Sequence, residues 1–70
     1  MLNERQKEIM QMLYEKGKVS VGEFAKTLFV TEMTVRRDLS QLEKAGFLRR
    51  YRGGAVLKIN LGEMPITQRL

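Results

Sequence analysis

The chain contains no cysteine, no histidine and no tryptophan, and only one proline among its 70 residues. Without cysteine it has no disulfide and no thiolate nucleophile, and without histidine it has no imidazole for acid–base catalysis or for a Ser-His triad. Zinc fingers built on cysteine and histidine are excluded for the same reason. A chain of this size also has little room to enclose a substrate cavity. The sequence therefore argues against an enzyme and predicts no cofactor and no metal site.

Long apolar runs are absent as well. No stretch approaches the roughly 18 consecutive apolar residues that a membrane-spanning helix needs, and the first eight residues lack the apolar core of a signal peptide. With 43% hydrophobic and 30% charged residues, the composition is that of a globular domain. We therefore expect a cytoplasmic protein without a membrane partner.

Acidic residues are the minority, since 13 lysines and arginines face 8 aspartates and glutamates and the net charge is +5. The excess is concentrated, because the segment from Lys44 to Lys58 carries five cations and no acid, whereas residues 1–30 are nearly neutral. A basic surface favours a polyanionic partner, with nucleic acid ahead of an anionic membrane.

Three helices are predicted from capping residues and apolar spacing. Asn3 followed by Gln6 is a capping box for a helix over about 3–16, with Gly17 as its stop. Ser20 and Glu23 repeat that spacing before the apolar series Val21, Phe24, Ala25 and Leu28. A third helix is expected from an N-cap at Thr31 to Gly46, with its apolar face formed by Val35, Leu39 and Leu42.

The second and third helices are separated by about three residues, 29–31, which matches a helix-turn-helix. In that motif the second helix lies in the DNA major groove. The link lacks the glycine often found there, which counts slightly against the assignment.

Two strand patterns follow, over 47–51 and 55–59, with a tight reversal at 52–54 between them. Three helices and a hairpin predict a mainly α fold with a small β part, a winged helix-turn-helix, in which Val19 could supply a third strand. We assign residues 1–58 to this domain. Residues 59–70 carry Gly62 and Pro65 without clear periodicity, and we expect a linker there.

The third helix presents a polar face opposite its apolar one. Arginine suits guanine acceptors or phosphate oxygens, glutamine suits adenine, and methionine or a threonine methyl can contact a thymine methyl group. Arg37 is the first candidate for a base contact. Alternatively, Arg36 and Arg37 belong to an ordinary solvated helix face, an equally good explanation from this helix alone. The face consists of Met33, Arg37, Ser40, Gln41 and Lys44, flanked by Thr34 and Arg36.

The hairpin adds Arg49, Arg50 and Arg52 next to Gly53 and Gly54. Glycines without bulk would let the tip approach a sugar-phosphate backbone or a minor groove. An ordinary type I′ turn explains the two glycines equally well. The functional interpretation is favoured because this basic tip follows directly on the arginine-bearing helix.

Several other side chains have two interpretations. We expect Asp38 to pair with a neighbouring basic side chain rather than to repel DNA. Glu32 suits the helix dipole, or could accept from a cytosine amino group. Tyr51 could contact the DNA backbone or pack under the wing. The remaining aromatic side chains are expected in the core: Tyr14, Phe24, Phe29 and Phe47.

One segment is specific enough to indicate a family. Residues 30–39 are VTEMTVRRDL, Leu42-Glu43 follows, and residues 46–55 are GFLRRYRGGA. This pattern resembles the DNA-binding domain of the DeoR family of bacterial transcription regulators, with V-S-x-x-T-[IV]-R-R-D-L, L-E, a glycine and R-x-H-G-G-A. The match covers about residues 3–58. Thr31 replaces the usual serine and keeps a capping hydroxyl, and Arg52 replaces a frequent histidine.

The resemblance implies the DNA-binding part of a repressor, usually of sugar or nucleoside catabolism genes, that binds a double-stranded operator. It implies a homo-oligomer in which a C-terminal domain, absent from these residues, binds a phosphorylated sugar, so that the chain is expected to be a fragment. By this analogy the Arg36-Arg37 stretch contacts the major groove and Arg52, Gly53 and Gly54 contact the flanking backbone or minor groove. The expected DNA-binding set is Thr31, Met33, Thr34, Arg36, Arg37, Ser40, Gln41, Lys44, Arg49, Arg50, Arg52, Gly53 and Gly54.

A winged helix can also dock a protein, so an interaction module with an acidic partner is the alternative function. RNA is disfavoured because the major groove of A-form RNA is too narrow for a helix.

Overall fold

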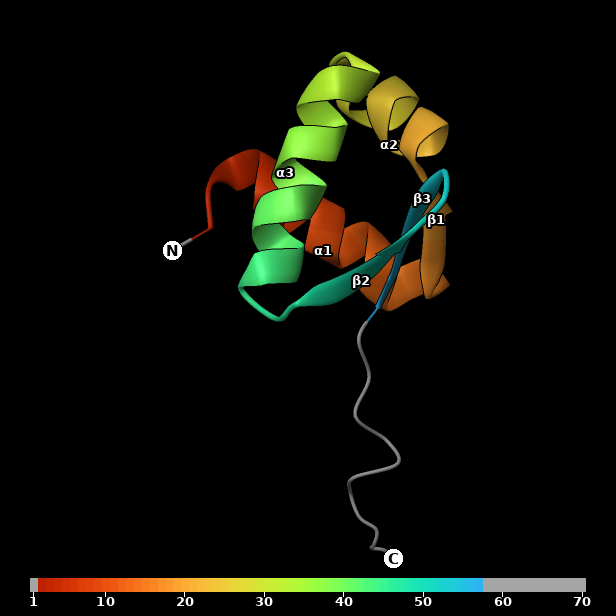
Figure 1. Cartoon of the computed structure of the whole chain (residues 1–70). Helices are drawn as coiled ribbons and strands as arrows, with labels where there is room; N and C mark the ends of the chain where they lie inside the picture. Colours follow the sequence, from red (N-terminus) through yellow and green to blue (C-terminus); the bar gives the residue numbers. More distant parts are fainter. Residues whose placement is uncertain (1, 58–70) are drawn as a thin grey trace, which may run out of the picture.

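Three helices and a small three-stranded sheet form the part of the chain that the computed structural model describes, residues 2–57 (Figure 1). The mainly α fold with a β-hairpin wing is therefore confirmed. The elements in chain order are α1 (Glu4–Lys16), β1 (Lys18–Ser20), α2 (Val21–Leu28), α3 (Glu32–Lys44), β2 (Leu48–Tyr51) and β3 (Gly54–Leu57).

The helix starts follow the predicted capping residues. The Asn3 side chain accepts from the Gln6 backbone N–H at 2.7 Å, and the Gln6 side chain accepts from the Asn3 N–H at 3.1 Å, which completes the first capping box. Ser20 accepts from the Glu23 N–H at 3.0 Å. The Glu23 carboxylate, however, pairs with Lys16 at the end of α1, so only the Ser20 half of the expected second box forms. That ion pair joins two consecutive helices.

Phe29 ends α2 in the left-handed conformation, with φ 59° and ψ 44°. It thus occupies the backbone state that glycine usually supplies at a helix end, which explains how the turn forms without one. The expectation that Phe29 belongs to the core is wrong, because its side chain is 92% exposed. The left-handed backbone turns the chain toward α3 while the neighbouring Leu28 and Val30 pack against the core.

The sheet has the order β1-β3-β2 and is antiparallel throughout. Val19 pairs with Ala55, which confirms the third strand. Tyr51 pairs with Gly54, so the reversal consists of Arg52 and Gly53 alone. A type I′ turn needs a positive φ at both of its central residues. Of Arg52 and Gly53, both within the described residues, only Gly53 has one, at 95°, so the type I′ interpretation is wrong. The predicted strand residues Lys58 and Ile59 and the predicted linker 59–70 lie outside the described residues.

Gly54 is required for space rather than for a positive φ. A Cβ atom at this position would lie 2.4 Å from the Val19 carbonyl oxygen, 2.6 Å from the Tyr51 hydroxyl and 2.8 Å from the Cα of Ser20. The central strand β3 can therefore approach β1 only with glycine here.

The core lies between the helices and the sheet and is mainly aliphatic. Phe24 is its one fully buried aromatic side chain among residues 2–57. Tyr14 and Phe47 were also expected inside but are 65% and 42% exposed. In α1 the inward position of that turn belongs to Leu13, which leaves Tyr14 on the outer side. The buried hydrophobic side chains are Ile9, Met10, Leu13, Val19, Val21, Phe24, Val35, Leu39, Leu42, Leu48 and Ala55.

Candidate nucleic-acid interface

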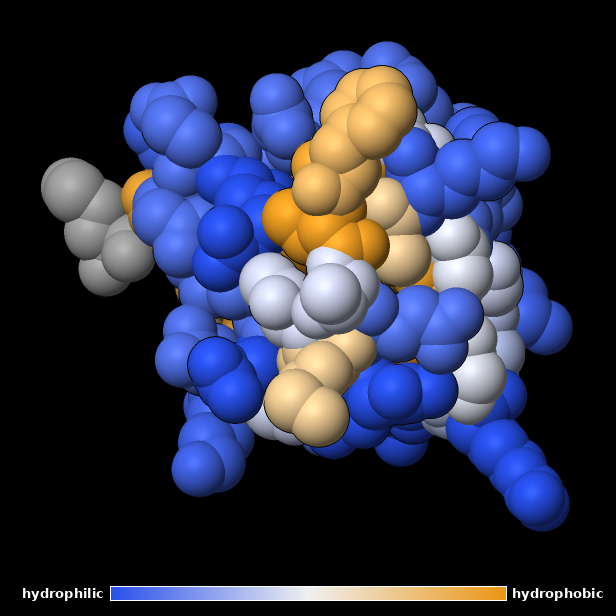
Figure 2. Space-filling model, turned by 90° about the horizontal axis from the view of Figure 1, so that it is seen from above, coloured by the Kyte–Doolittle hydropathy of each residue, from blue (hydrophilic) through white to orange (hydrophobic). Residues whose placement is uncertain are grey.

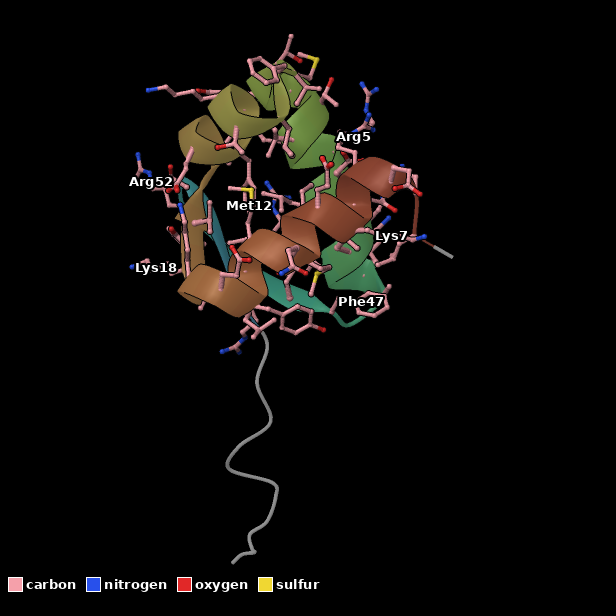
Figure 3. The ribbon with its side chains drawn as sticks, turned by 180° about the vertical axis from the view of Figure 1, so that it is seen from behind. Arg5, Lys7, Met12, Lys18, Phe47 and Arg52 are labelled. Carbon is pink, nitrogen blue, oxygen red and sulfur yellow. The ribbon has the colours of Figure 1, made fainter. Side chains whose placement is uncertain are left out.

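Helix α3 and strand β2 lie on the same side of α1, in front of it in Figure 1 and behind it in the reverse view of Figure 3. They are also packed against each other. The structure thus brings the two basic segments predicted from the sequence onto one side of the molecule. Of the predicted α3 residues, Thr34 and Ser40 are half-buried, and the exposed ones are Met33, Arg36, Arg37, Gln41 and Lys44.

The hydroxyl groups at the start of α3 are engaged within the helix. Thr31 accepts from the Thr34 backbone N–H at 3.2 Å and donates to the Thr34 hydroxyl at 3.1 Å. Thr31 is therefore the N-cap, as predicted. Its hydroxyl is hydrogen-bonded to that of Thr34. Of these two threonine side chains, the methyl groups are therefore the parts left for a contact with a partner.

A buried carboxylate fixes the orientation of α3 relative to α1. Asp38 is 3% exposed and accepts from two nitrogens of Arg5, Nε and, at 3.2 Å, Nη2. The hydrogen bond and the charge of Asp38 raise the pKa of the Arg5 guanidinium. The expected pairing of Asp38 is confirmed, but its partner lies 33 residues away on α1 rather than on α3. Sequence spacing gave no signal for this contact.

Gln41 also faces α1. Its Oε1 accepts from Gln6 Nε2 at 2.8 Å, and Gln6 in turn lies 3.5 Å from Asp38 Oδ1. A bidentate contact with adenine needs both the oxygen and the nitrogen of a glutamine amide. Because its oxygen is already engaged with Gln6, Gln41 is less available for such a contact than Arg37.

The two adjacent arginines of α3 differ in their surroundings. Arg36 is bound by Glu32 one turn earlier, at 3.1 Å, in an exposed i,i+4 ion pair. Arg37 is exposed and has no ion pair within residues 2–57. Arg37 thus presents a guanidinium whose donors are available to a partner.

Strand β2 is attached to α3 through Arg50. Its backbone N–H donates to Glu43 Oε2 at 2.9 Å, and its Nη1 donates to Ser40 Oγ at 2.6 Å. Arg50 therefore lies against the polar face of α3. Arg49, its neighbour in the strand, points to the opposite face of the sheet. Glu43 was not predicted as a site residue, although it anchors the wing.

The tip of the wing is held against α2 and β1. The Gly53 carbonyl accepts from the Val21 N–H at 2.7 Å, at the start of α2. The Tyr51 hydroxyl donates to the Val19 carbonyl at 3.5 Å, and Lys18 Nζ lies 4.9 Å from the Tyr51 ring centroid. Of the two interpretations of Tyr51, the structure supports packing within the wing.

Arg52 is exposed at this tip and projects at the same edge of the molecule as Lys18 (Figure 3). Lys18 was not predicted as a site residue, because it stands alone in the sequence between Gly17 and Val19. In the part of the chain that the structure covers, the predicted site cations whose side chains form no ion pair are Arg37, Lys44, Arg49, Arg50 and Arg52. Within that same part, no helix is both long and apolar enough to cross a bilayer.

Comparison with known proteins gives a consistent result. A model of the DeoR-like helix-turn-helix domain matches residues 5–59. The transcriptional regulator GolR of Listeria innocua is 43% identical over 54 residues, 77% of this chain and 21% of that protein. The lactose phosphotransferase system repressor of Streptococcus mutans is 46% identical over 52 residues, 74% of this chain and 21% of that protein. The Staphylococcus aureus repressor of the same name is 43% identical over 53 residues, 76% of this chain and 21% of that protein.

The chain thus spans about a fifth of the length of these curated relatives. Their names are those of regulators and repressors, not of enzymes. No solved structure matches the chain.

Proposed function

The chain belongs to the DeoR-like helix-turn-helix family, and on this premise we propose that it binds double-stranded DNA sequence-specifically as the DNA-binding part of a transcriptional repressor. Helix α3 would enter the major groove, with Arg37 contacting base edges. The single observation that carries this proposal is the position of Arg37, exposed and without an ion pair among residues 2–57, directly before the buried Asp38.

This arrangement suits base recognition because it combines an available guanidinium with a fixed helix. The Asp38 carboxylate is bound to Arg5, so the rotation of α3 about its axis is set by a contact with α1. Arginine can donate two hydrogen bonds to the O6 and N7 atoms of guanine. Such a contact needs an accurately placed backbone, which the ion pair provides.

The remaining cations suit the phosphate backbone. Arg50 lies beside Ser40 and Arg52 lies at the wing tip, so they flank the α3 face on its sheet side. Contacts with phosphates position a protein on the duplex without selecting a sequence. We assign Lys44, Arg50 and Arg52 to this role, with the exposed Gly53 allowing the approach. Arg49 lies on the opposite face of the sheet and Gly54 is buried against β1, so we leave these two predicted residues out of it.

A titration against duplex DNA at several salt concentrations tests the proposal. Because each neutralised phosphate releases counterions, the logarithm of the association constant should fall linearly with the logarithm of salt concentration, with a slope of about −0.9 per contact. Absence of binding at about 50 mM salt would contradict DNA binding. It would favour the alternative, a module that docks an acidic protein.

The curated relatives are about five times as long as the matched segment. We propose that a protein of that length containing this chain is a cytoplasmic, non-catalytic repressor of sugar or nucleoside catabolism genes. It would act as a homo-oligomer whose operator affinity is set by a phosphorylated sugar bound outside residues 1–70. The names of the lactose phosphotransferase system repressors support the sugar assignment. The test is a longer chain titrated with sugar phosphates while bound to its selected duplex, where release by one of them is the expected result.

A further inference from the structure

A phenylalanine at position 29 is unfavourable for the stability of this fold. Its side chain is 92% exposed, and its backbone is left-handed, with φ 59° and ψ 44°. Glycine or asparagine adopts that backbone with much less strain than a bulky residue. Neither packing nor backbone geometry in this domain therefore calls for phenylalanine at this position.

Phe29 does not stand alone on the surface. Met33, four residues later and in the first turn of α3, is 66% exposed. Figure 2 looks down on the end of the molecule where α2 meets α3 in Figure 1, and shows hydrophobic residues on this face, with paler ones between them and hydrophilic ones around them. We call Phe29 and Met33 the turn patch.

The turn patch continues the proposed DNA interface. In helix-turn-helix proteins the N-terminal residues of the second helix contact base edges. Met33 belongs to that part of α3, and Arg37 lies one turn further along the same helix. Exposed apolar side chains at this end of α3 would therefore lie closer to the base edges of the major groove than the rest of the helix.

The size of the turn patch favours DNA over a protein partner. A stable protein interface buries about 800 Å² on each side, whereas two side chains make a much smaller apolar area. Within a polar DNA interface, two apolar side chains are sufficient to contact individual groups. The apolar group that the major groove offers is the C5-methyl of thymine.

We propose that Phe29, together with Met33, contacts thymine methyl groups in the major groove, and that Phe29 is a specificity-determining residue. This inference rests on the proposed sequence-specific DNA binding. It assigns Phe29 a role distinct from that of Arg37, because an aromatic ring selects thymine by apolar contact and donates no hydrogen bond to the bases. The preferred site should therefore contain thymines at the base pairs that the start of α3 covers.

Replacement of single thymines by deoxyuridine tests this directly, because it removes only the methyl group. The full chain is first used to enrich duplexes from a random pool. Each thymine of the enriched site is then replaced in turn. Burial of one methyl-sized group predicts about a fourfold loss of affinity at each contacted thymine. With Phe29→Asn, which accepts the left-handed backbone, the same replacement should change affinity less than twofold at the thymine that Phe29 contacts, while a thymine contacted by Met33 should keep its full response.

Two controls separate this effect from misfolding. Phe29→Asn should unfold cooperatively at a temperature no lower than that of the unchanged chain. Tyr14→Asn removes an aromatic side chain from α1 that is 65% exposed, and should retain the full fourfold response to deoxyuridine.

Three outcomes contradict the inference. They are an enriched site without thymine, full affinity after every deoxyuridine replacement, and a loss at every responsive thymine that is the same in the unchanged chain and in Phe29→Asn. In each case a site has still been enriched, so the proposed DNA binding stands. If the pool yields no enriched site at all, sequence-specific binding fails, and the role of Phe29 fails with it.

Discussion

Arg5 of α1 and Asp38 of α3 form a bidentate ion pair in which the carboxylate is almost completely buried. Gln6, next to Arg5 in α1, donates through its Nε2 to Gln41 Oε1 on α3. The same Nε2 lies 3.5 Å from Asp38 Oδ1. These contacts connect the first helix to the helix that carries the proposed base contacts. We therefore expect Asp38 to act as a positioning residue for Arg37 beside it.

Loss of the Asp38 carboxylate should destabilise the domain. Asp38→Ala removes the acceptor of two Arg5 donors and is expected to lower the free energy of unfolding by about 1–3 kcal/mol. Urea denaturation followed by circular dichroism measures this change. Glu32→Ala is the matched control, because it breaks an exposed pair with Arg36 and should cost no more than about 0.5 kcal/mol. Equal losses in the two variants would refute the positioning role.

Two glycine-to-alanine substitutions should have opposite effects. Gly54→Ala places a Cβ atom 2.4 Å from the Val19 carbonyl oxygen, and overpacking of this kind costs about 1–3 kcal/mol. Gly22→Ala lies in α2, where the nearest atom would be 3.7 Å away. There alanine should stabilise the helix by up to about 1 kcal/mol. Thermal unfolding of both variants checks the signs, and a tolerated Gly54→Ala would contradict the described approach of β3 to β1.

The backbone at Phe29 makes a further prediction about stability. Phe29→Asn should raise the free energy of unfolding by about 0.5–1 kcal/mol, because asparagine relieves part of the left-handed strain and no buried contact is lost. Denaturant unfolding measures the change. A clear loss of stability would mean that the phenylalanine ring packs against the domain.

The wing tip should contribute to affinity without contributing to sequence preference. Arg52→Ala is expected to weaken binding to all duplexes by a similar factor and to reduce the magnitude of the salt slope by about 1. Lys7→Ala, on α1 and paired with Glu4, is the control and should leave the slope unchanged. A change of preferred sequence in Arg52→Ala would place Arg52 among the base contacts instead.

Local patterns were sufficient to predict much of this fold. The N-cap side chains of Asn3, Ser20 and Thr31 each accept a hydrogen bond from the backbone N–H three residues later. Both partners of each cap therefore lie within one short stretch of sequence, which makes the cap predictable. A third strand at Val19, in the extended link between the first two helices, was foreseen only as a possibility, and the structure forms it.

What the sequence did not predict depends on contacts between distant segments. The partner of Asp38 lies on another helix, and the need for Gly54 arises from the backbone of β1 across the sheet. The exposure of Tyr14 and Phe29 was also missed, because which aromatic side chains enter a small core depends on its packing, and this mainly aliphatic core takes in only Phe24 among the aromatics of residues 2–57. The roles of the predicted DNA-binding residues stay predictions.

The most direct test of the account compares the unchanged chain with Arg37→Ala on the duplex enriched from a random pool. If Arg37 contacts guanine through two hydrogen bonds, the variant should lose about 1–3 kcal/mol on that duplex, about 5- to 150-fold in affinity. It should also lose its preference at one base pair while keeping its affinity for unrelated DNA. Unchanged affinity and unchanged preference would contradict the assignment of α3 to the major groove.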